Sequence, residues 1–142
     1  MERFIITSAL PYANGPIHIG HIAGAYLPAD IFVRYQKLKQ NDVIFVCGSD
    51  EHGAAITLRA KKEKKTPREI IDLYHEKNEK SFKALNINFN IYHRTSSKLH
   101  HETAQNFFRT LHSKNVFIKR KSKQFFDVSA NQFLADRYIP VS

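Results

Sequence analysis

Residues 9–21 read Ala-Leu-Pro-Tyr-Ala-Asn-Gly-Pro-Ile-His-Ile-Gly-His, and this stretch decides the fold of the 142-residue chain. An apolar, β-branched run at residues 4–8 precedes it and is typical of a buried strand. Apolar residues recur at helical spacing from Ile19 onward. The prolines and the Asn-Gly pair inside the stretch prevent either element from continuing through it. The sequence therefore predicts a strand–loop–helix junction that places His18 in the first turn of the helix.

The start of this helix is a favourable place for an anion, because its first N–H groups lack partners and the helix dipole is positive there. His18 and His21 are three residues apart, so both imidazoles lie on one face of the first turn and point toward the same anion. Gly20 has no side chain, so a flat group such as adenine can approach the backbone. These residues predict a phosphate or nucleotide site. A helical zinc pair or two surface histidines are the alternatives, and neither uses the Pro/Asn/Gly loop.

A second strand is predicted after the helix. Helical spacing extends over residues 19–40, and Pro28 predicts a kink near residues 24–27. The apolar run at residues 43–47 is typical of a strand buried on both faces. Two strands joined by a helix form a βαβ crossover, which predicts an α/β fold with a parallel, doubly wound sheet and a site at the carboxyl ends of its strands.

The loop at residues 48–53, Gly-Ser-Asp-Glu-His-Gly, directly follows the second strand. At the carboxyl end of a parallel strand it is expected to face residues 11–21 across a cleft. The carboxylate of Asp50 is suited there to bind an ammonium group. The alternative is a helix N-cap, in which Ser49 or Asp50 caps a helix that begins near Ala54. Both hold together if Ser49 caps and Asp50 binds.

The rest of the chain predicts further helices and strands. Helices are expected at residues 56–65, 66–84 and 98–114, and strands at residues 86–92, 116–120, 124–127 and 133–139. Thr66 is the expected cap of the second of these helices, and Ser96 or Ser97 that of the third. Residues expected to face inward on the third helix are Leu99, Ala104, Phe107, Phe108 and Leu111. The histidines interpreted as surface or packing residues are His75, His93, His100, His101 and His112.

The composition sets broader limits. The net charge of +9 favours a polyanionic partner, although a skewed gene composition also produces such a Lys- and Asn-rich chain. Cys47 is the only cysteine, which excludes an internal disulfide and a multi-cysteine zinc site in these residues. No apolar run reaches membrane-spanning length, and residues 1–8 lack the basic start of a signal peptide, so we expect no membrane association and a cytoplasmic location.

The residues quoted above carry a resemblance to a known family. Residues 18–21, His-Ile-Gly-His, resemble the HIGH signature of the class I aminoacyl-tRNA synthetases, and residues 9–17 resemble the stretch before it in the methionyl-tRNA synthetases. The resemblance implies a Rossmann-like, nucleotide-binding half of the catalytic fold in residues 1–115. It implies that residues 116–142 begin the inserted connective peptide. The basic run at residues 119–123, with Phe125 and Phe126 beside it, is suited to meet the acceptor end of tRNA, and a solvated hairpin is the alternative.

The resemblance also implies roles for individual residues. His18 and His21 would be catalytic. The ATP-binding residues that it implies are Asn14, His18, Gly20 and His21. The methionine-binding residues that it implies are Leu10, Tyr12 and Asp50, with Asp50 on the α-ammonium. No metal ligand is implied in this chain.

The activity implied in this way is that of a methionine–tRNA ligase. It activates methionine with ATP, accompanied by Mg²⁺, and transfers it to tRNA(Met). The resemblance further implies that zinc binds only in a later part of the connective peptide, that the chain is a fragment, and that it is inactive by itself. Two alternatives stay open: another His-x-Gly-His nucleotidyltransferase, complete near this length, and a non-enzymatic module that binds tRNA without ATP.

Overall fold

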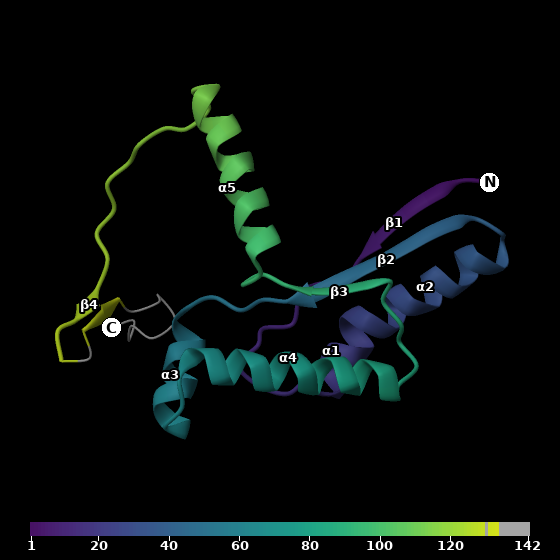
Figure 1. Cartoon of the computed structure of the whole chain (residues 1–142), viewed down its shortest axis with the longest axis horizontal. Coiled ribbons are helices and arrows are strands. Elements are labelled where there is room, and N and C mark those ends of the chain that lie inside the picture. Colours follow the sequence, from purple (N-terminus) through teal and green to yellow (C-terminus); the bar gives the residue numbers. More distant parts are fainter. Residues whose placement is uncertain (130, 134–142) are drawn as a thin grey trace. The chain divides into compact units, whose positions relative to one another are not determined.

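The computed structural model describes residues 1–129 and 131–133, and the chain divides into two units, residues 1–102 and 103–142. A parallel sheet of three strands forms the centre of the first unit (Figure 1). The strands are β1 (Arg3–Thr7), β2 (Asp42–Ser49) and β3 (Ile91–Arg94), in that spatial order. The predicted parallel α/β fold is therefore confirmed. The predicted domain boundary between residues 115 and 116 stays a prediction.

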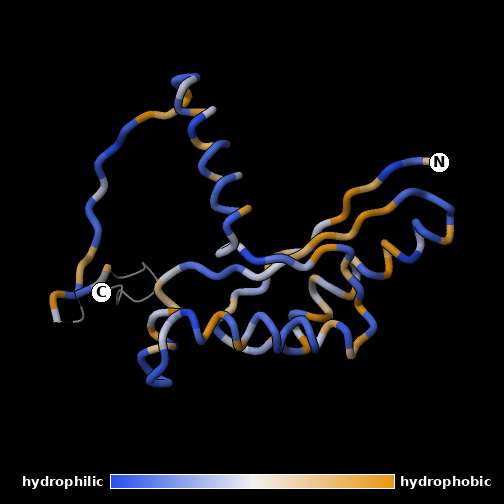
Figure 2. The backbone as a smooth tube through the Cα atoms, in the orientation of Figure 1, coloured by the Kyte–Doolittle hydropathy of each residue, from blue (hydrophilic) through white to orange (hydrophobic). Residues whose placement is uncertain are grey.

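The sheet is covered on one face by two helices of the first unit, α2 (Leu27–Leu38) and α4 (Pro67–Ala84) (Figure 1). Burial alternates along β2, since Val43 and Phe45 are buried whereas Ile44 is 44% exposed. Ile5 of β1 is 77% exposed. The expectations of a doubly wound sheet and of a second strand buried on both faces are thus wrong for the described residues. Figure 2 shows the reason for the error, because the middle parts of β1 and β2 are continuously hydrophobic.

The junction helix has three parts: α1 (Ile19–His21), the π-helical η1 (Ile22–Tyr26) and α2. The N–H of Leu27 donates to the carbonyl of Ile22, five residues earlier. Pro28 follows immediately and has no N–H to donate, so the regular ladder cannot pass through this turn. A π-helical turn therefore lies where the sequence predicts a kink, and the kink itself stays a prediction.

The third strand is shorter than predicted. Asn86 has a φ of +56°, which ends the chain's helical path, and β3 begins only at Ile91. Between them, Ile87 is buried in the core, and the side chain of Asn90 accepts a hydrogen bond from the Phe45 N–H at 2.8 Å. The alternation of apolar and polar residues over 86–92 therefore comes from a packed loop that leads into a strand.

The other helices largely match their predictions. Helix α3 spans Ala54–Glu63, and α4 begins with a capping box between Thr66 and Glu69, as predicted. Ser97 accepts from the His100 N–H at the start of α5 (Lys98–Ser113), which confirms that predicted cap. None of the residues of α5 is buried, so the apolar residues predicted to face inward on it do not do so.

The second unit contains a short antiparallel pair, β4 (Phe126–Asp127) and β5 (Gln132–Phe133). Residues 116–120 form no strand, which corrects that prediction, and the strand predicted at residues 133–139 lies almost wholly outside the described residues.

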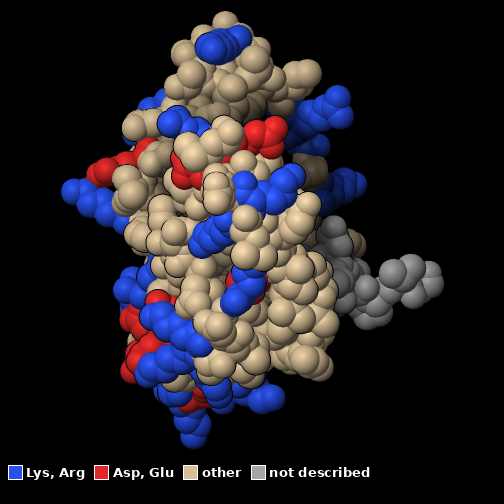
Figure 3. Space-filling model, turned by 90° about the vertical axis from the view of Figure 1, so that its right-hand side faces the viewer, with Lys and Arg blue, Asp and Glu red and all other residues tan. Residues whose placement is uncertain are grey.

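None of the described helices combines the length and apolarity that crossing a bilayer requires. Basic side chains are spread over the face shown in Figure 3, with acidic ones among them, so that face carries no patch of a single sign.

Candidate functional site

The two predicted site loops are joined directly. The Asp50 N–H donates to the Pro11 carbonyl at 2.9 Å, and the Ala13 N–H donates to the Asp50 carbonyl at 2.8 Å. These bonds form a parallel bridge between Tyr12 and Asp50 just beyond the carboxyl ends of β1 and β2. The structure therefore places the carboxylate-bearing loop beside the loop that leads to His18, as the parallel sheet predicts.

His18 and His21 form a stacked pair, with ring centroids 3.7 Å apart. Nδ1 of His18 accepts from the Gly20 N–H at 3.1 Å, and Nδ1 of His21 accepts from the His18 N–H at 3.2 Å. Because each Nδ1 is an acceptor, the proton of each neutral ring lies on Nε2. Both residues are exposed. The first turn thus presents two ring N–H donors side by side, which is an arrangement suited to phosphate oxygens.

This capping changes one expectation about the helix start. The Gly20 N–H was expected to lack a partner, but the imidazole of His18 binds it. A Cβ on Gly20 would lie 3.0 Å from Cε1 of that same ring. The glycine is therefore needed for the close packing of the His18 ring against the backbone, in addition to the approach of a ligand that the sequence predicted.

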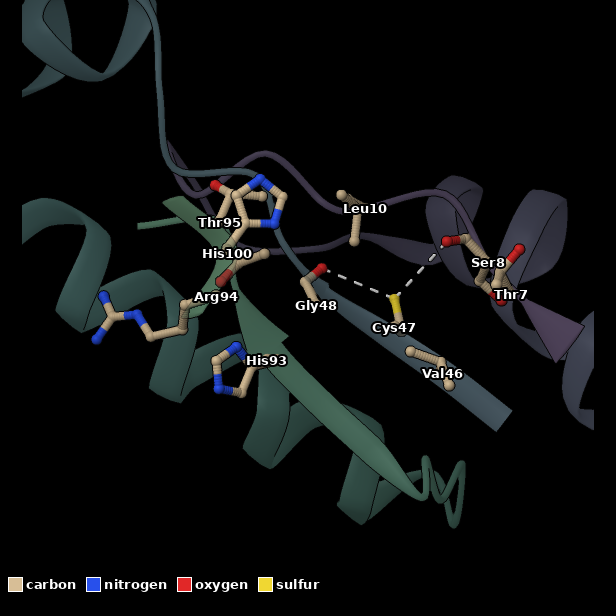
Figure 4. Close-up of a pocket in the computed structure, with 11 residues that line it drawn as sticks. Thr7, Ser8, Leu10, Val46, Cys47, Gly48, His93, Arg94, Thr95 and His100 are labelled. Atoms are coloured by element: carbon tan, nitrogen blue, oxygen red, sulfur yellow. Dashed lines mark hydrogen bonds between the residues drawn. The ribbon is translucent and has the colours of Figure 1, made fainter. Parts of the chain in front are cut away.

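The remaining predicted residues line two different pockets. Tyr12, Asn14 and His21 line a small pocket of about 90 Å³ under the junction loop. Leu10 is 47% exposed and lines a larger, mainly apolar pocket of about 420 Å³ over the carboxyl ends of the three strands (Figure 4). His93, Thr95 and His100 also line this larger pocket. No motif pointed to them as site residues, and the two histidines were interpreted as surface or packing residues, because all three come from a segment distant in sequence.

Cys47 lies in the wall of the larger pocket, beside Gly48 and Ser8 (Figure 4). Burial raises the pKa of its thiol to about 11. The thiol therefore stays protonated at neutral pH and contributes to the wall, not to nucleophilic chemistry. In the part of the chain that the structure describes, no group of three or more His, Cys, Asp or Glu side chains is placed to hold a metal ion.

The helix-cap interpretation of Ser49 and Asp50 is wrong. The N-cap of α3 is Gly53, and no side chain forms a capping hydrogen bond there. Asp50 is half-buried and only its Oδ1 receives a long contact of 3.5 Å from the His52 N–H. Gly53 has a φ of +118°, and a Cβ at this position would lie 2.5 Å from the Tyr12 hydroxyl. Its conformation and its closeness to Tyr12 both require glycine.

Glu51, next to Asp50, is the centre of a buried charged cluster that the sequence did not reveal. Its carboxylate is fully buried and accepts from Ser49 Oγ at 2.8 Å, from Arg94 Nε at 2.7 Å and from Ser96 Oγ. Burial raises the pKa of this carboxyl, but the hydrogen bonds from Ser96, Ser49 and Arg94 outweigh that effect and hold the pKa below its ordinary range. Glu51 is therefore ionised at neutral pH.

His75 completes this cluster from α4. Its Nδ1 lies 2.6 Å from Ser49 Oγ, and its ring stacks on Tyr92 at 5.1 Å. The Ser49 hydroxyl donates its one proton to the Glu51 carboxylate, which can only accept, so Nδ1 of His75 carries a proton and donates to Ser49. Burial, followed by the nearby Arg94 charge, lowers the pKa of His75. The ring is therefore neutral at pH 7.

This lowered pKa predicts a pH dependence of stability. The unfolded chain binds a proton at His75 more readily than the folded chain, so the stability from this residue is complete above about pH 6.5 and falls as the pH drops below it. We expect urea unfolding of the chain between pH 7.5 and 5.5 to show this loss, and His75→Gln to reduce its slope. His93→Gln, at an exposed position, is the control. An identical slope in the wild type and in His75→Gln would contradict the prediction.

Comparison with known proteins places this site in a family context. The family model described as tRNA synthetases class I (M) matches residues 4–142. The methionine–tRNA ligase of Bacteroides fragilis is 59% identical over 138 residues, which are 97% of this chain and 20% of that protein. The methionine–tRNA ligase of Flavobacterium johnsoniae is 58% identical over 138 residues, which are 97% of this chain and 19% of that protein. The chain thus spans about a fifth of the length of these relatives.

Two solved structures share the fold. Mycobacterium tuberculosis methionyl-tRNA synthetase, in complex with methionyl-adenylate, superposes with a TM-score of 0.83 at 25% identity, over 96% of this chain and 27% of that one. A leucyl-tRNA synthetase of Agrobacterium radiobacter K84, in a ternary complex with tRNA, superposes with a TM-score of 0.81 at 22% identity, over 95% of this chain and 17% of that one. The second comparison bears on the fold only.

Proposed function

Because the chain belongs to the family of class I tRNA synthetases (M), we propose that it supplies one half of the catalytic site of a methionine–tRNA ligase. Such an enzyme activates methionine with ATP to methionyl-adenylate and then transfers the methionyl group to tRNA(Met). The observation that carries the proposal is the junction of two loops that brings Asp50 beside Tyr12, which lines one pocket with His21 of the stacked histidine pair. The identity of more than half of the residues with methionine–tRNA ligases supports it.

The first reaction requires no covalent enzyme intermediate, since the carboxylate of methionine is itself the nucleophile. A carboxylate oxygen forms a bond to the α-phosphorus of ATP, and the bond from that phosphorus to the oxygen bridging to the β-phosphate breaks. Pyrophosphate leaves with the electron pair. The protein's contribution is alignment and stabilisation of the negative charge that grows on the phosphate oxygens. The Nε2–H groups of His18 and His21 are suited to this task, because they are adjacent donors whose other ring nitrogen is already bonded.

The family resemblance assigns the site an amino-acid side and a nucleotide side. In this proposal Asp50 binds the α-ammonium of methionine, and Leu10 and Tyr12 lie along its side chain. Asn14 and Gly20 lie on the ATP side with the two histidines, and Mg²⁺ accompanies ATP as part of the substrate. Support comes from the placement of Tyr12, Asn14 and His21 around one pocket. The net charge of +9 fits tRNA as a partner, and we expect the enzyme to act in the cytoplasm, where translation uses its product.

A chimera tests this function directly. In it the chain replaces the matching segment of the Bacteroides fragilis methionine–tRNA ligase, to which it is 59% identical. We expect methionine-dependent exchange of pyrophosphate into ATP, with leucine and isoleucine ineffective. The 142-residue chain by itself is expected to give no exchange, because charges on only one side of a site cannot exclude water or stabilise pyrophosphate.

The outcomes separate the three candidate functions. A preference for leucine or isoleucine in the chimera would reject methionine specificity. Exchange by the chain without its relative's remaining segments would favour a self-contained nucleotidyltransferase. Salt-sensitive tRNA binding by the chain, with an inactive chimera and no ATP binding, would favour a tRNA-binding module.

A further inference from the structure

The buried carboxylate of Glu51 is held in one orientation by hydrogen bonds. Both of its oxygens are bonded, with Arg94 Nε at 2.7 Å from Oε1 and at 3.0 Å from Oε2. The Glu51 N–H donates to Thr95 Oγ1 at 2.9 Å, so its backbone is fixed as well as its side chain. All of these bonds reach across to the segment at the end of β3. Glu51 is therefore fastened to a neighbouring strand in both main chain and side chain.

Asp50 is held on both sides, by hydrogen bonds to the junction loop and by its covalent link to Glu51. On one side its N–H and carbonyl are bonded to Pro11 and Ala13 at 2.9 and 2.8 Å. On the other side it is covalently joined to Glu51. Ser49 and Glu51 are buried and bonded to each other, while Asp50 is half-buried, which is the alternation of an extended chain. A rotation of the Glu51 backbone dihedral angles would therefore change the orientation of the Asp50 carboxylate.

Arg94 connects this loop to the rest of the first unit. Its Nε binds Glu51, and its Nη2 forms an ion pair of 2.6 Å with Asp72 Oδ1 on α4. Arg94 thus links the Glu51 carboxylate to α4 through two contacts of similar length. Figure 4 shows the Arg94 side chain directed away from the pocket that its backbone lines. Arg94 is thus placed to act on a substrate only through Glu51.

Such a pair contributes more to geometry than to stability. Removing two charges from water costs nearly as much as their attraction returns, so a buried ion pair is weak support for a fold. A planar guanidinium that contacts Glu51 through Nε and Asp72 through Nη2 nevertheless fixes direction in a way that a lysine ammonium cannot. We propose that Arg94 is a positioning residue that, through the buried carboxylate of Glu51, orients Asp50 toward the α-ammonium of methionine. This inference rests on the proposed function.

The effect of Arg94 and Glu51 on methionine binding can be measured in the chimera with the Bacteroides fragilis enzyme. Arg94→Lys and Glu51→Gln are expected to raise the KM for methionine in pyrophosphate exchange by about 10- to 100-fold, the scale of a misplaced binding group. We expect kcat at saturating methionine and the KM for ATP to change less than about threefold, because the histidine pair is untouched. A loss of kcat without a change in KM would overturn the proposal.

The matched control is Asp30→Asn. Asp30 forms an ion pair of 2.6 Å with Arg34 on α2, in which the carboxylate is buried and the arginine is half-exposed. This variant is expected to lower the melting temperature while leaving the KM for methionine unchanged. An equal rise of KM in Asp30→Asn would show that the effect is general loss of stability, and would overturn the positioning role.

A second measurement does not depend on activity. In the 142-residue chain, the amides of Asp50 and Ala13 should exchange hydrogen at least about 10-fold faster in Arg94→Lys than in the wild type or in Asp30→Asn. Unchanged protection of both amides would refute the positioning role whatever the kinetic result. If the chimera with the wild-type segment is inactive although the Asp50 and Ala13 amides of the wild-type chain are protected, the result contradicts the proposed function. Faster exchange with an active chimera whose KM is unchanged would show that the loosened loop does not position Asp50 for methionine.

Discussion

His21→Ala in the chimera is expected to lower kcat for adenylate formation about 10²-fold, the usual effect of removing one donor to transition-state charge. The KM for methionine should stay within about twofold, because the ring interacts mainly with charge that develops during the reaction. The structure sharpens this expectation, since Nδ1 of His21 is occupied by the His18 N–H and only Nε2–H is available to phosphate.

The cap formed by His21 needs a separate control. Alanine removes the acceptor for the His18 N–H as well as the Nε2–H donor. His21→Glu keeps an acceptor at the third helical position, as in a capping box, but cannot donate to an oxyanion. If helix capping is the role of His21, His21→Glu should restore activity and melting temperature together. If phosphate contact is its role, His21→Glu restores only stability. Wild-type turnover in His21→Ala would refute the catalytic assignment.

Asp50→Ala in the chimera is expected to raise the KM for methionine at least about 30-fold, which corresponds to about 2 kcal/mol of lost binding free energy. The α-ammonium would then be buried without a counter-charge. Asp50→Asn keeps the size of the side chain and should lose nearly as much, because the amide has no charge. kcat at saturating methionine should fall less than KM rises.

The matched control for this prediction is Asp42→Ala, at the opposite end of the same strand. Asp42 is exposed and pairs with Arg3 at 3.5 Å on the surface, so its removal should change neither stability nor KM appreciably. Since Gly53, not Asp50, caps α3, a loss of helix capping cannot explain an effect of Asp50→Ala. Unchanged KM in both Asp50 variants would reject the ligand role of this residue.

Local sequence signals predicted most of the elements correctly. Three of these signals depend on residues a few positions apart: the junction at residues 9–21, the capping box of Thr66 and Glu69, and the Ser97 cap. Their backbone preferences act within one or two turns, so they can be read without the fold. The parallel order of β1 and β2 followed from chain connectivity for the same reason, because a short crossover through a helix permits little else.

The start of β3 and the faces of the sheet could not be predicted in this way. Ile87 and Phe89 show the alternation of a strand, yet they pack from a loop against helix α4 and the sheet. Ile44 has the apolarity of a buried strand residue and is 44% exposed. Hydropathy states which residues favour burial, but only the positions of the neighbouring helices decide which of them are covered.

For the candidate site, the sequence determined which residues lie in the two loops, and the tertiary structure decided how they are held. His18, His21 and Asp50 were selected by motif and by their places at strand and helix ends. The buried charged cluster around Glu51 could not be predicted from the sequence. Glu51 and Arg94 are 43 residues apart, and each has the sequence context of an ordinary surface charge. The fold buries the Glu51 carboxylate fully and most of the Arg94 side chain by pairing the ends of β2 and β3. Because a buried charge must find a partner wherever the chain brings one, that contact is fixed by three-dimensional packing and not by any local pattern.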